Sequence, residues 1–398
     1  MISTIHKPVK DPTLPAIIFV PGYKGSILAQ PESGRRVWVD AYEATLGRKS
    51  LELPYPGSID TLPLDLVEAG ILRGVDYLPG LFGLDVYGTP LRTLERNFAG
   101  TANVIPLSYD WRRDLMVGVK ALAAKVAQLR SAGADSISIV AHSMGGLITT
   151  YYLRYGTQPI EAAVENWEGA RIVRNVVLAG VPFKGSILSF RDLQFGTLTG
   201  INTTLLSAKA LHSFGSIYQL LPAPGVAPLL SSKLEQLPDW IYDWQAWHKY
   251  GWGPLSYAQS KSTNQTHKAY IQGRIHSANR LFELLHRPAN PNATFQAQAD
   301  FTLLNLRGLK RDTLAHCIFE PQTGQLACDP KMLRAKFPTI SPKHLMQDGD
   351  GTVTTDSSEL PQAYLQLTDK VDTIYSEADH TRLLHDWQTM AKVINFLN

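Results

Sequence analysis

One serine in this chain has the surroundings of a reactive nucleophile. It lies in the segment 141–146 (AHSMGG), between the apolar run 137–140 and a helical pattern that begins at Met144. Small residues two positions before and after a serine allow a strand and a helix to pass closely at a sharp turn. Such a turn directs the hydroxyl out of the fold, where it can attack a carbonyl carbon. Ser143 is therefore a candidate nucleophile, and the alternative is an ordinary serine that ends a buried strand.

A serine hydroxyl needs an imidazole to take its proton, and the imidazole needs a carboxylate to hold its tautomer. Two aspartates lie in the segment 348–353 (DGDGTV), and His380 follows a strand-like run. We predict Asp350 as the acid, because the compact turn after it would aim its carboxylate, with Asp348 as the alternative. We predict His380 as the base from its place before the last helix, and the order Ser, Asp, His is that of α/β-hydrolases. Two other histidines are interpreted differently: His142 as a packing group or a group that supports the site from beside the nucleophile, and His385 as a helix residue that faces solvent or core.

Attack on a carbonyl also needs two backbone N–H donors for the oxyanion that forms. One donor is normally the residue after the nucleophile, here Met144, and the other comes from the loop after an early strand. A glycine-rich loop, 21–26, follows the apolar run 16–20. We predict Tyr23 as the second donor, with Lys24 as the alternative.

Strands that alternate with helices must position these groups. Continuous apolar runs of this length are typical of strands covered on both faces of a parallel sheet. Helical spacing of apolar residues predicts a helix over 115–129, and a closing helix is predicted over 381–396. The pattern predicts an α/β fold with a mostly parallel sheet flanked by helices. The predicted strands are 16–20, 104–107, 137–140, 173–179, 301–306 and 371–375.

Two stretches interrupt this alternation, 28–90 and about 186–299, and both are rich in Pro, Gly and aromatic residues. Core elements lie on both sides of each stretch. We therefore predict a single catalytic domain over residues 1–398 with two cap insertions.

The second insertion contains a tryptophan-rich segment. We predict a helix there with Asp239 as its N-cap and Gly251 as its stop. One face of this helix would carry Trp240, Trp244 and Trp247. Packing or lining of a substrate pocket is the favoured interpretation of that face, ahead of peripheral contact with a lipid interface.

Composition narrows the classes of function. The chain has 398 residues, 44% of them hydrophobic and 18% charged, and a net charge of +3 without a basic block, which argues against nucleic acid as a partner. The sequence has no apolar run of about 18 residues that could span a membrane, so we expect a soluble protein. It also has no apolar segment of a secretion signal, so we expect a cytoplasmic rather than a secreted protein. We predict no metal site and no cofactor, because their ligand patterns are missing. Cys317 and Cys328 could form one local disulfide or remain two free thiols.

Five motifs follow one another over nearly the whole chain, and His380 comes after them: 20–26 (VPGYKGS), 108–112 (SYDWR), 141–146 (AHSMGG), 180–186 (GVPFKGS) and 348–353 (DGDGTV). Together they resemble the lecithin:cholesterol acyltransferase family. The resemblance implies an α/β-hydrolase core with a lid and a membrane-binding cap, and glycerophospholipids or other acyl esters as substrates. It implies the nucleophile, acid and base already named and the oxyanion donors Tyr23 and Met144. For the segment 109–112, which includes Trp111, it implies a pocket wall, and a buried ion pair is an equal alternative.

These observations predict a serine hydrolase of lipid acyl esters that acts through an acyl-serine intermediate, with transfer to an alcohol as a minor route. Extracellular members of the family carry a secretion signal and a cap disulfide near the N-terminus, and this sequence shows neither. Their localisation and partners are therefore not expected here. The alternatives are a general carboxylesterase or polyester esterase and a non-catalytic lipid-binding protein.

Overall fold

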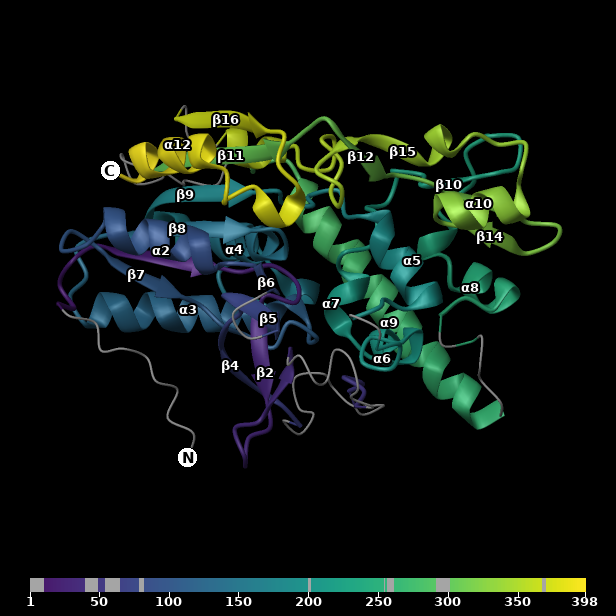
Figure 1. Cartoon of the computed structure of the whole chain (residues 1–398), viewed down its shortest axis with the longest axis horizontal. Coiled ribbons are helices and arrows are strands. Elements are labelled where there is room, and N and C mark those ends of the chain that lie inside the picture. The colour runs from purple at the N-terminus through teal and green to yellow at the C-terminus, as the bar shows by residue number, and fades with distance from the viewer. Residues whose placement is uncertain are drawn as a thin grey trace.

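Six short strands form the central sheet of the protein, seen here in a computed structural model (Figure 1). Across the sheet their order is β16-β11-β9-β8-β1-β7, and every neighbouring pair is parallel. The strands predicted from the sequence are confirmed, with ends that shift by a residue or two. They are β1 (Ala16–Val20), β7 (Asn103–Pro106), β8 (Ile137–His142), β9 (Val173–Ala179), β11 (Thr302–Gly308) and β16 (Val371–Ser376).

The structure describes most of the chain. Parts of both predicted cap insertions lie outside the described residues, and the division of the chain into one domain with two insertions stays a prediction. The described ranges are 11–39, 49–53, 65–78, 82–199, 202–253, 255, 261–290, 301–366 and 370–398.

Alternate residues of each strand face two separate hydrophobic cores, because side chains along a strand point in turn to opposite faces. Ile18 and Val20 pack with the helices α3 (Leu115–Ser131) and α4 (Met144–Tyr155). Ile17 and Phe19, their neighbours in β1, pack with α2 (Gly88–Asn97) and α12 (Trp387–Leu397) on the other face. Helices therefore cover both faces, which explains why the inner strands β1 and β8 are almost wholly apolar, whereas the edge strand β16 is mostly exposed and contains Asp372 and Thr373.

Between β1 and α2 the chain forms small antiparallel sheets. One has the order β3-β2-β4, and β5 pairs with β6 in a hairpin. These strands are β2 (Ser26–Ala29), β3 (Arg36–Trp38), β4 (Val67–Ile71), β5 (Gly74–Leu78) and β6 (Phe82–Asp85).

A larger group of elements lies beside the carboxyl ends of the central strands. The helices α5 to α9 follow β9, and the connection from β11 to β16 adds strands and a helix to the same group, which the sequence did not predict. We call the cap α5 (Ile187–Phe195), α6 (Ala208–His212), α7 (Gly215–Tyr218), β10 (Leu229–Leu230), α8 (Trp244–Tyr250), α9 (Lys261–His286), β13 (Cys317–Glu320), β14 (Gln325–Ala327) and α10 (Pro330–Lys336). The same connection contains β12 (Arg311–Leu314), β15 (Met346–Gly349) and α11 (Gln362–Leu365).

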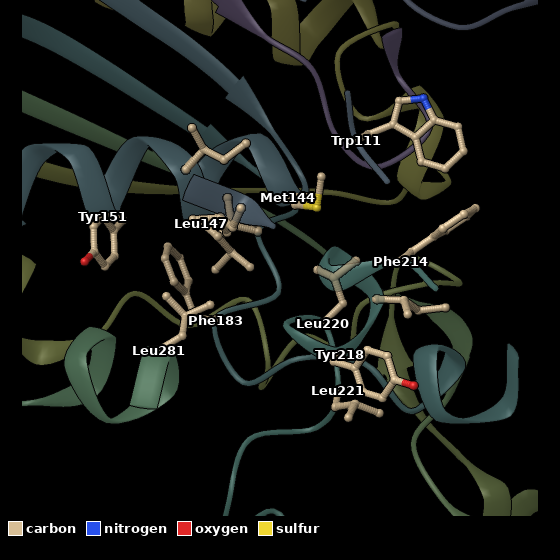
Figure 2. Packing of buried hydrophobic residues seen from close by; sticks show 14 of the residues in the cluster. Trp111, Met144, Leu147, Tyr151, Phe183, Phe214, Tyr218, Leu220, Leu221 and Leu281 are labelled. Atoms are coloured by element: carbon tan, nitrogen blue, oxygen red, sulfur yellow. The ribbon is translucent and has the colours of Figure 1, made fainter. Parts of the chain in front are cut away.

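The cap packs directly on the helix that follows the candidate nucleophile. Figure 2 shows Met144 and Leu147 of α4 in one apolar layer with Leu281 of α9 and with Phe214 and Leu220. Within the described ranges, no helix is both long enough and apolar enough to cross a membrane.

A disulfide between Cys317 and Cys328 connects β13 to the segment after β14. Of the two alternatives left open for these cysteines, the structure therefore has the bonded one.

The tryptophan-rich helix begins later than predicted. Residues Trp240–Tyr242 form only a single 3-10 turn, and α8 begins at Trp244, where the side chain of Asp243 accepts the backbone N–H of Gln245. Asp239 occupies the N-cap position of the 3-10 turn but not that of α8, and it makes no side-chain capping bond, since its carboxylate accepts the N–H of Gly225 at 2.7 Å. The predicted stop is confirmed: Gly251 ends α8 with φ of +63°.

The last helix also begins later than the predicted residue 381. Residues His380–Arg382 form a 3-10 turn, and α12 begins at Trp387. Asp386 caps it by accepting the N–H of Thr389 at 2.8 Å. His385 therefore precedes the helix, and its Nε2 lies 3.4 Å from a carboxylate oxygen of Asp85.

Candidate active site

Ser143 stands at the sharp turn between β8 and α4. Its φ of 55° and ψ of −127° form a conformation that a residue with a side chain rarely adopts. The turn is held by the N–H of Ser143, which donates to the carbonyl of Ala179 at 2.8 Å. A Cβ at Gly145 would approach the backbone oxygen of Val20 to 2.4 Å, so only glycine fits there. The small-residue pattern read from the sequence thus reflects a close approach of α4 to β1.

His380 lies between Ser143 and Asp350. Its Nε2 is 2.9 Å from Ser143 Oγ, and its Nδ1 is 2.7 Å from Asp350 Oδ2. In a neutral imidazole, Nδ1–H donates to the carboxylate, so Nε2 is free to accept the serine proton. The structure brings these three predicted residues together from three separate loops.

The structure also distinguishes the two candidate acids. Asp350 is buried, and its Oδ1 accepts the N–H groups of Thr352 at 2.9 Å and Val353 at 2.7 Å. Burial raises the pKa of Asp350, but the charge and hydrogen bond of His380, with these two N–H groups, outweigh it and hold the pKa below its ordinary value. Asp348 is exposed and accepts the N–H of Lys310 at 2.5 Å. Asp350 is thus the aspartate that pairs with His380.

The loop after β1 lies directly against the nucleophile. Its turn is closed by the N–H of Gly25, which donates to the carbonyl of Gly22 at 3.0 Å, and Lys24 has φ of +67°. A Cβ at Gly22 would lie 2.7 Å from the Cβ of Ser143, so the loop can approach only as glycine. We call residues 21–26 the oxyanion loop. Among the described residues no group accepts a hydrogen bond from the N–H of Tyr23, Lys24 or Met144, so Tyr23 and its alternative both stay predictions.

The segment 109–112 is hydrogen-bonded to the oxyanion loop. The hydroxyl of Tyr109 donates to the carbonyl of Pro21 at 2.7 Å, and the indole N–H of Trp111 donates to that of Ser26 at 3.0 Å. The ring of Trp111 also meets that of Tyr23 edge-on, with 5.1 Å between centroids. Trp111 is fully buried, and its role in a substrate pocket stays a prediction.

The same segment contains the buried ion pair that the sequence left as an alternative. The guanidinium of Arg112 is fully buried and bonds Asp110 and Asp65, both at 2.9 Å. Arg112 therefore connects the segment to residues of the first insertion.

The three cap tryptophans lie in aromatic contacts of the cap. Trp247 is fully buried with Phe190, and Trp240 meets Phe319. Trp244 is half-buried and contacts His248. Their proposed lining of a pocket stays a prediction.

Tyr87 and His142 also belong to the site. His142 was interpreted as a packing group or a supporting group of the site, and Tyr87 was not predicted at all. The N–H of Gly22 donates to the Tyr87 hydroxyl at 2.9 Å, and that hydroxyl lies 2.8 Å from Nδ1 of His142. Nε2 of His142 lies 2.9 Å from the backbone oxygen of His380. Burial, and then the nearby His380, lower the pKa of His142 to about 3. The only sequence signal was the position of His142 beside Ser143, and nothing local marked Tyr87.

Comparison with known proteins identifies the family of this chain. The family model for lecithin:cholesterol acyltransferase matches residues 66–392. This chain belongs to that family. An uncharacterized protein of Saccharomyces cerevisiae is 24% identical to this family member over 245 residues, 60% of the chain. The chain spans about a third of that relative's length, 34%.

Among solved structures, a chain of the Tle4–Tli4 complex shares the fold of this family member. It aligns with a TM-score of 0.59 at 13% identity, over 96% of this chain and 98% of that one. The mature form of the Bacillus licheniformis lipase BlEst2 aligns with a TM-score of 0.40 at 14% identity, over 98% and 96% of the two chains. The fold is that of the α/β-hydrolases, as predicted.

Proposed function

We propose that this member of the lecithin:cholesterol acyltransferase family is a serine hydrolase of lipid acyl esters. The observation that carries the proposal is the hydrogen-bonded series Ser143, His380 and Asp350 at the carboxyl end of the sheet. Family membership supports the lipid class of the ester.

In the proposed first step, Ser143 Oγ attacks the ester carbonyl while His380 Nε2 takes the serine proton. Asp350 stabilises the imidazolium that results, and its depressed pKa keeps it ionised for this role. The N–H groups of Tyr23 and Met144 stabilise the oxyanion. When the tetrahedral intermediate collapses, His380 returns its proton to the leaving alcohol, and the acyl group stays on Ser143.

The second step repeats this chemistry with water. His380 takes a proton from the water that attacks the acyl-serine, and gives it to Ser143 Oγ as the fatty acid leaves. An alcohol can take the place of water and would produce a new ester. We propose hydrolysis as the main route, because water is present at far higher concentration than any alcohol.

The test follows the labelled acyl chain of a phospholipid in vesicles, with and without a sterol or a long-chain alcohol. We expect mostly free fatty acid, and a minor amount of new ester when the alcohol is present. Mostly new ester would show an acyltransferase. Cleavage of short esters without release from any lipid would show a general esterase.

The Ser143→Ala variant tests the nucleophile. We expect turnover to fall by about 10⁴-fold or more, with an unchanged circular dichroism spectrum. A fluorophosphonate should label the wild type at the peptide that contains Ser143 and should leave the variant unlabelled. Failure to label the folded wild type would favour a lipid-binding protein without catalysis.

A further inference from the structure

The bonds between Gly22, Tyr87, His142 and the main chain of His380 allow one arrangement of protons. The backbone oxygen of His380 can only accept, so Nε2 of His142 carries a hydrogen. A buried His142 is neutral, so its Nδ1 has none and accepts the O–H of Tyr87. The oxygen of Tyr87 in turn accepts the N–H of Gly22. Only with these donors and acceptors does every polar atom of this buried series have a hydrogen-bond partner.

Three members of the series lie beside or within groups that the reaction uses. Gly22 directly precedes Tyr23, the predicted oxyanion donor, and His142 directly precedes Ser143. The accepting carbonyl belongs to His380 itself. The loops of the oxyanion donor, the nucleophile and the base are therefore joined through two side chains.

We propose that Tyr87 and His142 are positioning residues that hold the oxyanion loop and the main chain of His380 in register with Ser143. The proposal rests on the proposed serine-hydrolase function. It adds a hydrogen-bonded connection between the oxyanion loop and the loop that carries His380. Small displacements of catalytic groups cost large factors in rate, so such a connection affects turnover directly.

The hydroxyl of Tyr87 is the part of this residue that packing does not explain. Its ring packs edge-on against Phe19 at 5.2 Å, and a phenylalanine would pack in the same way. Tyr87 occupies the N-cap position of α2, but its side chain makes no capping bond there. The hydroxyl instead bonds the oxyanion loop and His142.

The first test is Tyr87→Phe, measured with p-nitrophenyl butyrate. We expect kcat to fall about 10- to 100-fold while KM changes less than about threefold, because the loops shift and the binding surface stays. Rates are divided by the concentration of sites that a fluorophosphonate titrates at completion, so unfolded protein does not count.

The second test compares two substitutions of His142. A glutamine amide offers one acceptor and one donor at nearly the spacing of the two imidazole nitrogens, whereas leucine fills a similar volume without either. We expect His142→Gln to stay within about fivefold of the wild-type kcat and His142→Leu to fall about 10- to 100-fold. A purely steric role would make the two variants alike.

The kcat of the double variant Tyr87→Phe/His142→Leu should be at most about threefold lower than that of the slower single variant, because both changes break the same hydrogen-bonded series. The matched control is Tyr364→Phe, another buried tyrosine whose hydroxyl donates to a backbone oxygen, that of Thr150 at 2.9 Å. It should keep the wild-type kcat.

Two outcomes separate this inference from the proposed function. Wild-type kcat in folded Tyr87→Phe and His142→Leu, together with an inactive Ser143→Ala, would overturn the positioning role alone. An active Ser143→Ala would overturn the proposed function whatever Tyr87 does.

Discussion

The surroundings of Ser143 and the interior of the cap are both buried, but different interactions hold them. Around Ser143, directional hydrogen bonds join His380, Asp350 and His142 at 2.7 to 2.9 Å. In the cap, aromatic rings surround Phe319, with centroids of Tyr250 at 4.7 Å and Trp252 at 5.1 Å. Hydrogen bonds fix the positions of individual atoms, whereas apolar contacts mainly fill volume.

This difference separates the expected effects of substitution. A change near Ser143 should alter the rate far more than the stability, because few apolar contacts are lost while reacting atoms move. A change in the cap should alter the stability and leave the chemistry of a short ester nearly intact. The predictions below test this separation.

The largest effect is expected from the acid. Asp350→Asn should lower kcat by about 10⁴-fold, because an amide stabilises the wrong tautomer of His380 and cannot stabilise the imidazolium. Steady-state hydrolysis of a short ester measures it. The matched control is Asp348→Asn, two residues away, which should lower kcat by less than about tenfold. Equal losses would contradict the assignment of the acid.

In the cap, Phe319→Ala should destabilise the protein by about 3–5 kcal/mol, because it leaves a cavity beneath the rings of Trp240, Tyr250 and Trp252. Denaturant unfolding measures the free energy, and kcat for a short ester should stay within about threefold. The exposed Trp387 is the control, since Trp387→Ala should cost less than about 0.5 kcal/mol. A loss of rate in folded Phe319→Ala comparable to that of Asp350→Asn would break the separation.

The smallest effect, taken per pH unit, is a pH dependence of stability that originates in His142. Its pKa is about 3 in the folded protein and near 6.5 when unfolded, so protons favour the unfolded state. Its contribution is complete above about pH 6.5 and is lost as the pH falls towards 3, by at most about 1.4 kcal/mol per pH unit. Unfolding free energies at pH 7, 5 and 4 measure it. The unfolding free energy of His142→Gln should fall less steeply with decreasing pH than that of the wild type. Parallel curves would show that His142 takes up a proton in the folded protein as readily as in the unfolded one.

Local sequence patterns predicted the parts of the fold that local physics decides. Apolar runs marked the inner strands β1 and β8 most clearly, because a strand buried on both faces is largely apolar, whereas the exposed edge strand β16 had a weaker pattern. Gly251 was recognised as a helix stop because its left-handed conformation favours glycine. The start of α12 was placed too early, since several residues after His380 could begin a helix and the capping bond of Asp386 decides among them.

The sequence by itself determined the six strands, the sharp turn at Ser143 and the order of serine, aspartate and histidine. Only the tertiary structure decided that Asp350, and not Asp348, meets His380, because the choice depends on how the loop after β15 approaches the base. It alone brought Tyr87 to His142, 55 positions apart in the chain. A hydrogen bond between distant residues leaves no periodic pattern in a sequence, because it requires only that the folded backbone bring one donor within about 3 Å of one acceptor.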